Sequence, residues 1–141
     1  MILTDSNLLM YAVGAEHPNK TPAVRFLDRV ARGEIEAVLD AEALQEVIHR
    51  YTALRRWADG QRVYRLAREI FPRILPITGE IMDEAKRLVD ADASLVARDA
   101  VHAAVVLVHR MDGICTFDRD FDRIPGCRRI APESAYPSDS R

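Results

Sequence analysis

Three aspartates, Asp118, Asp120 and Asp122, stand at every second position directly after an apolar run that ends at Thr116. Because aspartate is rare in strands, this pattern predicts a strand over residues 114–116 followed by an acidic loop. Crowded carboxylates repel one another unless a cation or a basic group neutralises them. The loop is therefore a candidate metal site whose other ligands must come from elsewhere in the chain.

Three further carboxylates occupy positions that call for a cause. Asp5 ends the apolar opening of the chain, where capping of the next helix is the alternative to a site. Glu46 borders the apolar stripe of a predicted helix, and its alternative is a surface ion pair with Arg50 at i+4. Asp99 opens an otherwise apolar helix, whose dipole alone favours an anion. With Asp118 they form a set of four carboxylates.

The chemistry of this set is that of hard oxygen donors, which suit Mg²⁺ or Mn²⁺. The sequence has no zinc-ligand spacing, no Walker glycine loop and no Gly-x-Ser-x-Gly elbow. Acidic clusters that hold one or two such cations commonly hydrolyse phosphodiesters. Of the loop aspartates, Asp118 is the preferred ligand, Asp120 a second candidate and Asp122 a solvated charge. The Thr116 hydroxyl can support a carboxylate, whereas we interpret His102 as a hydrogen-bonded core histidine.

Short apolar runs alternate with longer helical patterns along the chain. Strands are expected over residues 1–4, 37–39, 74–77, 114–116 and 128–130, and helices over 7–11, 22–32, 43–54, 62–71, 79–89 and 97–108. Thr21 and Pro22 are the predicted N-cap and N1 of the second helix. The alternation indicates an α/β fold with a parallel sheet, in which ligands bind at the carboxyl ends of the strands. Pro76 predicts that its strand lies at a sheet edge.

The composition is that of one soluble domain: 141 residues, 48% of them apolar, with a net charge of -2. No apolar block approaches the roughly 20 residues that cross a bilayer, and we see no secretory signal, so no membrane role is expected. Two cysteines are interpreted as plain thiols of a cytoplasmic protein. An arginine-rich region with aromatics, residues 50–68, is interpreted either as an RNA contact or as a protein interface.

Four segments taken in order resemble the PIN-domain family, and within it the VapC-type toxins of bacterial toxin–antitoxin pairs. They are residues 3–9 (LTDSNLL), Glu46 in its helix, residues 97–104 (ARDAVHAA) and residues 116–121 (TFDRDF). The resemblance implies a three-layer α/β/α fold with a central parallel sheet of four to five strands. It further implies a single domain over residues 1–131, with residues 132–141 as a flexible tail.

The same resemblance implies a Mg²⁺- or Mn²⁺-dependent endoribonuclease. By motif match, the acidic active-site and metal-binding positions are Asp5, Glu46, Asp99 and Asp118, and Asp120 stands at a position that is often acidic in relatives. Ser6 replaces the more usual threonine and keeps the hydroxyl. The implied partners are an RNA substrate, an antitoxin whose tail occupies the active-site groove, and a second copy of the chain in a homodimer, with a hetero-oligomer with the antitoxin as a further form.

Other activities compete with this interpretation. One is a PIN-type nuclease that acts on DNA or structured RNA ends outside a toxin system, which the compact length disfavours. Another is a non-catalytic RNA-binding PIN module, which the intact set of four carboxylates argues against. A regulator with a phospho-accepting Asp5 is disfavoured because the only lysines, Lys20 and Lys86, are poorly placed.

Overall fold

A parallel sheet of five strands forms the centre of the protein, whose computed structural model describes residues 1–135. The strands are β1 (Ile2–Thr4), β2 (Ala37–Asp40), β3 (Ile74–Leu75), β4 (Gly113–Cys115) and β5 (Arg129–Ile130). Their order across the sheet is β3-β2-β1-β4-β5, and every neighbouring pair is parallel. The predicted α/β class and parallel sheet are confirmed, and the strand before Pro76 lies at the sheet edge, as expected.

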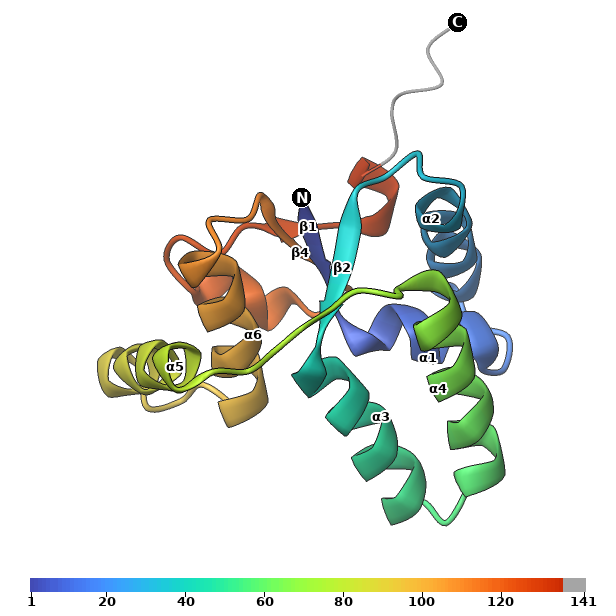
Figure 1. Cartoon of the computed structure of the whole chain (residues 1–141), viewed down its shortest axis with the longest axis horizontal. Helices are drawn as coiled ribbons and strands as arrows, with labels where there is room; N and C mark the ends of the chain where they lie inside the picture. Colours follow the sequence, from blue (N-terminus) through green and yellow to red (C-terminus); the bar gives the residue numbers. More distant parts are fainter. Residues whose placement is uncertain (136–141) are drawn as a thin grey trace, which may run out of the picture.

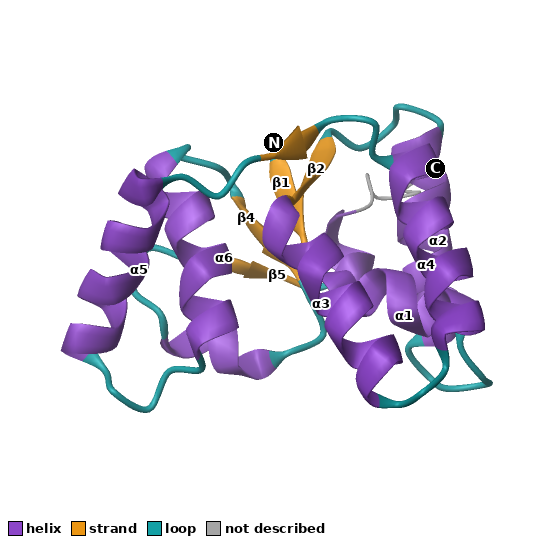
Figure 2. Cartoon of the chain, turned by 60° about the horizontal axis from the view of Figure 1, so that its bottom comes forward, coloured by secondary structure: helices purple, strands orange, loops and turns teal. Residues whose placement is uncertain are grey.

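Helices cover both faces of this sheet (Figures 1 and 2). They are α1 (Ser6–Val13), α2 (Lys20–Ala31), α3 (Ala41–Ala53), α4 (Trp57–Ile70), α5 (Gly79–Ala91) and α6 (Ala97–Val108), with the short 3₁₀ helices η1 (Arg119–Arg123) and η2 (Pro132–Ala135). Figure 1 shows α5 and α6 together on one side of the strands, and α1, α2 and α4 on the other. The fold thus has the three layers that were expected.

Successive strand residues point into two separate cores. Leu3, Val38 and Ile114 pack with α5 and α6, whereas Leu39 and Cys115 pack with the helices of the opposite face. Because both faces of the sheet are covered, residues that point to either face are apolar, as in the run Ala37, Val38 and Leu39 of β2. The polar residues that directly follow β1 and β4 therefore need a separate explanation.

The helix boundaries differ from the prediction by one or two residues at several ends and by five residues at the start of α4. Helix α2 begins at Lys20, two residues earlier than Pro22 suggested, and there the Lys20 N–H bonds the His17 carbonyl at 3.0 Å. Helix α4 begins at Trp57 instead of residue 62, directly after a tight turn in which Arg55 has φ of 55°.

The tail expected from Pro132 starts with η2, whose proline is buried, and residues 136–141 lie outside the described part. Across residues 1–135 no helix has both the length and the apolar character needed to cross a membrane.

Candidate functional site

Four carboxylates from four separate elements line one cleft of about 660 Å³ at the carboxyl end of the sheet. Asp5 directly follows β1, and Asp118 lies just beyond the neighbouring strand β4. Asp99 stands in the first turn of α6, and Glu46 on α3. The four positions picked from the sequence therefore share one space, and Ser6 lines it with them.

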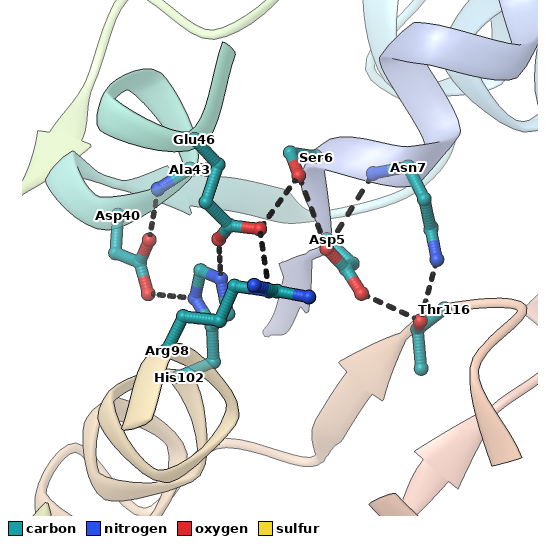
Figure 3. A network of polar contacts seen from close by, with 9 residues as sticks. All are labelled: Asp5, Ser6, Asn7, Asp40, Ala43, Glu46, Arg98, His102 and Thr116. Carbon is teal, nitrogen blue, oxygen red and sulfur yellow. Dashed lines mark hydrogen bonds and ion pairs between the residues drawn. The ribbon is translucent and has the colours of Figure 1, made fainter. Parts of the chain in front are cut away.

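The hydroxyl groups of Thr116 and Ser6 hold Asp5 in place (Figure 3). Its Oδ2 accepts a hydrogen bond from the Thr116 hydroxyl at 2.7 Å, and its Oδ1 accepts from the Asn7 N–H at 3.4 Å, so it also caps α1. Burial raises the pKa of Asp5, and nearby Glu46 acts in the same direction. The capping role and a site role thus coexist in one residue. A buried carboxyl with a raised pKa at a cleft is a candidate functional group.

Asp99 faces Asp118 and Asp120 across the mouth of the cleft, where one carboxylate oxygen of each lies within 4.8 Å of the others. Burial, and then the charges of Asp118 and Asp5, raise the pKa of Asp99 to about 6. Asp118 is oriented from two sides, since its N–H donates to the Thr116 hydroxyl and its Oδ1 accepts from the Asp120 N–H.

The third loop aspartate, Asp122, points away from this group. It forms a surface pair with Arg129 at 2.9 Å. Of the three loop aspartates, Asp118 and Asp120 therefore lie near Asp99, and Asp122 does not.

Glu46 turns toward the cleft instead of pairing along its own helix. Its Oε2 accepts from the Ser6 hydroxyl at 3.1 Å, and the Arg98 Nε lies 3.9 Å from the same oxygen. Its Oε1 is bonded to Nε2 of His102. The surface pair with Arg50, the alternative considered from the sequence, is not formed within residues 1–135.

His102 and Asp40 are the residues whose importance the sequence did not disclose. His102 is 1% exposed, and its two ring nitrogens face Oδ2 of Asp40, at 2.7 Å, and Oε1 of Glu46. Burial disfavours its charge, but the two carboxylates outweigh burial and raise the pKa of His102 well above its usual range. Its interpretation as a hydrogen-bonded core histidine agrees with this geometry. Asp40 is fully buried and also caps α3 through Ala43, and the only signal for it in the sequence was its place before a helix.

The donor set fits a hard divalent cation. Asp5, Asp99 and Asp118 line one cleft, and the charges of Asp118 and Asp5 both act on Asp99; a bound Mg²⁺ or Mn²⁺ would relieve this repulsion. At the cleft wall, Asn7 Oδ1 is buried and has no hydrogen-bond partner within residues 1–135. A buried acceptor without a protein donor suits a hydrated cation, whose water ligands are strong donors.

Comparison with known proteins identifies the family of this chain. Residues 2–126 match the family model of the PIN domain. The chain belongs to the PIN-domain family. It is 40% identical to Ribonuclease VapC13 of Mycobacterium tuberculosis over 131 residues, which are 93% of this chain and the whole of that protein. It is 33% identical to Ribonuclease VapC23 of the same species over 84% of this chain and 93% of that protein. These identities place the chain among the VapC members of the family.

Solved structures share the fold at lower identity. A chain of a toxin–antitoxin complex from Klebsiella pneumoniae superposes with a TM-score of 0.67 at 22% identity, over 94% of this chain and 98% of that one. The structure of VapBC2 from Rickettsia felis, bound to a DNA fragment from their promoter, contains a chain that superposes with a TM-score of 0.73. That chain is 14% identical, and the match covers 93% of this PIN chain and 98% of the other. The PIN fold expected from the resemblance is thereby confirmed.

Proposed function

We propose that this PIN protein is a metal-dependent endoribonuclease that serves as the toxin of a toxin–antitoxin pair. The observation that carries the proposal is the convergence of Asp5, Glu46, Asp99 and Asp118, from four separate elements, on one cleft. Its 40% identity to a VapC ribonuclease over nearly the whole chain supports the same activity.

Each carboxylate has a part in this proposal. Asp5, Asp99 and Asp118 would hold Mg²⁺ or Mn²⁺, with Asp120 near enough to take part. When bound, such a cation supplies activation of water and neutralisation of charge at the scissile phosphate. Glu46 faces the same space from the α3 side, where its carboxylate can orient the attacking water or bind a second cation.

Neutral groups fix the carboxylates in place. Ser6 Oγ lies 3.1 Å from Glu46 Oε2 and 3.4 Å from Asp5 Oδ1, so it bridges the two carboxylates. Thr116 donates to Asp5 and accepts from the Asp118 N–H, which ties the ends of β1 and β4 together. These hydroxyls orient the acidic groups before a cation or a phosphate arrives.

The proposed partners are an RNA and an antitoxin protein. The cleft mouth carries Arg98 and Arg50, which can bind the phosphates that flank the scissile bond. The toxin–antitoxin complex from Klebsiella pneumoniae supports an antitoxin partner, because one of its chains shares this fold. A homodimer, a hetero-oligomer with the antitoxin and a cytoplasmic location stay predictions.

The second candidate function is RNA or protein binding through the arginine-rich region. Trp57, Tyr64, Arg65 and Arg68 line a separate pocket of about 570 Å³ between α3 and α4. Trp57 is 39% exposed there, so a nucleic-acid base or a partner side chain can stack on it. This surface can bind RNA next to the cleft or a protein partner.

The test is cleavage of labelled single-stranded RNA by the purified protein in Mg²⁺ or Mn²⁺, then in EDTA, then after the cation is restored. We expect cleavage only with the cation, loss of cleavage in Asp99→Asn, and near-normal cleavage in the control Asp122→Asn, which changes a surface carboxylate of the same acidic loop. Equal cleavage by Asp99→Asn and the wild type would refute the assignment. Preferential cleavage of a DNA strand of the same sequence would favour the alternative nuclease.

A further inference from the structure

We infer that His102 is a positioning residue, which uses Asp40 as its anchor to hold the Glu46 carboxylate in the cleft. The inference rests on the proposed function of this cleft and adds two residues to it. Neither residue lines the cleft beside the four carboxylates, so both act through Glu46.

The contacts form a continuous chain across two helices (Figure 3). Asp40 is fixed at the start of α3, because its Oδ1 accepts from the Ala43 N–H at 2.9 Å. Its other oxygen, Oδ2, lies 2.7 Å from Nδ1 of His102 on α6. The opposite ring nitrogen, Nε2, is bonded to Oε1 of Glu46, one and a half turns further along α3. The imidazole therefore bridges α6 to two points on α3.

Burial restricts the side chains of Asp40 and His102 to these contacts. His102 is 1% exposed and Asp40 fully buried, so neither side chain can turn toward water. A buried carboxylate without a partner is costly, which commits Asp40 to the ring and the ring to Glu46. A glutamate has three side-chain torsions to fix, and bonds from His102 and Ser6 to its two oxygens remove that freedom.

Arg98 is a competing partner for the Glu46 carboxylate. Arg98 Nε lies 3.9 Å from Glu46 Oε2, and the Arg98 side chain is 59% exposed. Without the imidazole bond, the carboxylate is free to follow this arginine toward solvent. A mobile glutamate would bind or orient a cation or water less well, because misplaced ligands lose the benefit of preorganisation.

A direct role for His102 as a metal ligand fits the geometry less well. One ring nitrogen lies within 4.8 Å of carboxylate oxygens of both Asp5 and Glu46, as a ligand would. However, both nitrogens already face carboxylates, and a metal bond would have to displace the bond to Glu46. A histidine that is bonded on both sides is a support for a ligand, comparable to the outer groups that orient ligands at metal sites.

The experiment compares variants that remove the contacts between Asp40, His102 and Glu46 with a variant that keeps part of them. The double variant Asp40→Asn/His102→Leu removes the imidazole and leaves no buried charge unpaired, while the asparagine still caps α3. His102→Gln keeps an N–H donor that can reach Glu46. Both are made in the wild type and in Glu46→Ala, with His109→Gln, an exposed position at the end of α6, as the control. The readouts are Mn²⁺ affinity by electron paramagnetic resonance, kcat/KM on RNA, and thermal unfolding.

If His102 positions Glu46, the effect of the substitutions at Asp40 and His102 should depend on the presence of Glu46. The double variant should lose about 10–100-fold in Mn²⁺ affinity or kcat/KM, the usual cost of losing an outer-shell partner, and His102→Gln should recover part of that loss. In the Glu46→Ala background the same changes should add little. A purely structural role predicts the same loss in both backgrounds, and that result, or no loss in the wild type, would overturn the inference.

A wrong function and a wrong positioning role give different results. If the wild type neither binds Mn²⁺ nor cleaves RNA, the function is wrong, and crystal structures of the wild type and the double variant then decide the inference. We expect the Glu46 carboxylate to stay at the cleft in the wild type and to move toward Arg98 in the variant. An unchanged Glu46 position would overturn the inference.

Discussion

Asp99→Asn should make the metal-free protein more stable while it destroys its activity. The pKa of Asp99 is raised from 3.8 to about 6 by burial and by the charges of Asp118 and Asp5. At neutral pH the carboxyl is therefore ionised against the preference of the folded state. Asparagine has nearly the same shape and carries no charge, so it removes this repulsion. The same substitution removes an oxygen ligand that the proposed cation needs.

The magnitude follows from the two pKa values. A rise from 3.8 to about 6 corresponds to about 3 kcal/mol at 1.36 kcal/mol per pK unit. Because Asp99 is only partly buried, solvent screening reduces this figure by about half. The dipole of α6 favours the ionised form by about 0.3–1 kcal/mol, which reduces it again. We therefore expect a gain of about 1 kcal/mol, or about 3 °C in the melting temperature of a domain of this size.

The sign of the pH dependence gives the sharper assay. The folded state holds the Asp99 proton more tightly than the unfolded state, so the contribution of Asp99 to stability is fully present below pH about 4 and is lost as the pH rises through about 6. The gain from Asp99→Asn should therefore appear at pH 7 in EDTA and vanish at pH 4. Urea unfolding at both pH values measures it.

Two results would refute this reasoning. One is a variant that is less stable than the wild type at pH 7 in EDTA, and the other is a gain that is the same at both pH values. The Asp122→Asn protein serves as the matched control, because its carboxylate lies on the surface beside Arg129, and there the gain should be absent.

Three other predictions follow from the same structure. Mn²⁺ affinity should fall by about tenfold for each pH unit below about 6, because the cation must displace the Asp99 proton, and an affinity that is constant from pH 5 to 7 would contradict this. Gly60→Ala should cost about 1–3 kcal/mol in urea unfolding, because the added Cβ would come within 2.7 Å of a side-chain carbon of α3. The control Gly79→Ala, which meets no atom within 4 Å, should be nearly neutral, and equal effects would be evidence against the close approach of α3 and α4. Cys127 should resist thiol reagents in the folded protein, because burial raises its pKa to about 11. Rapid labelling without denaturant would show that the Cys127 thiol is accessible to solvent.

The sheet could be predicted because its signals are local. Each strand is a short apolar run bounded by polar residues, and the alternation with helices leaves a parallel sheet as the economical arrangement. Pro76 was informative for the same reason, since a missing N–H restricts a strand to an edge, where β3 indeed lies. From these runs alone, Asp5 and Asp118 could be placed at one edge of the sheet.

The helix starts were less predictable because tertiary contacts decide them. Thr21 and Pro22 have the residue types of an N-terminus, yet the chain already turns at Lys20 and makes the first helical bonds there. Helix α4 starts at Trp57, because the turn before it folds back on α3 and Gly60 permits the close approach. No local pattern carries this information.

The support of Glu46 lay beyond prediction for a similar reason. Asp40 and His102 are 62 residues apart, and their contact depends on how α3 and α6 pack across the carboxyl end of the sheet. In the sequence, Asp40 is one more residue before a helix and His102 one polar residue among apolar ones. Only the fold reveals that a single imidazole joins Asp40 to the acidic cleft.

We propose that Asp5, Asp99 and Asp118 hold a catalytic divalent cation. The most direct measurement is the anomalous scattering of Mn²⁺ in crystals of the protein soaked at pH 7. We expect a peak in the cleft, within about 2.5 Å of a carboxylate oxygen from each of the three. A peak elsewhere on the surface, or a cleft without a peak at Mn²⁺ concentrations that support RNA cleavage, would contradict it.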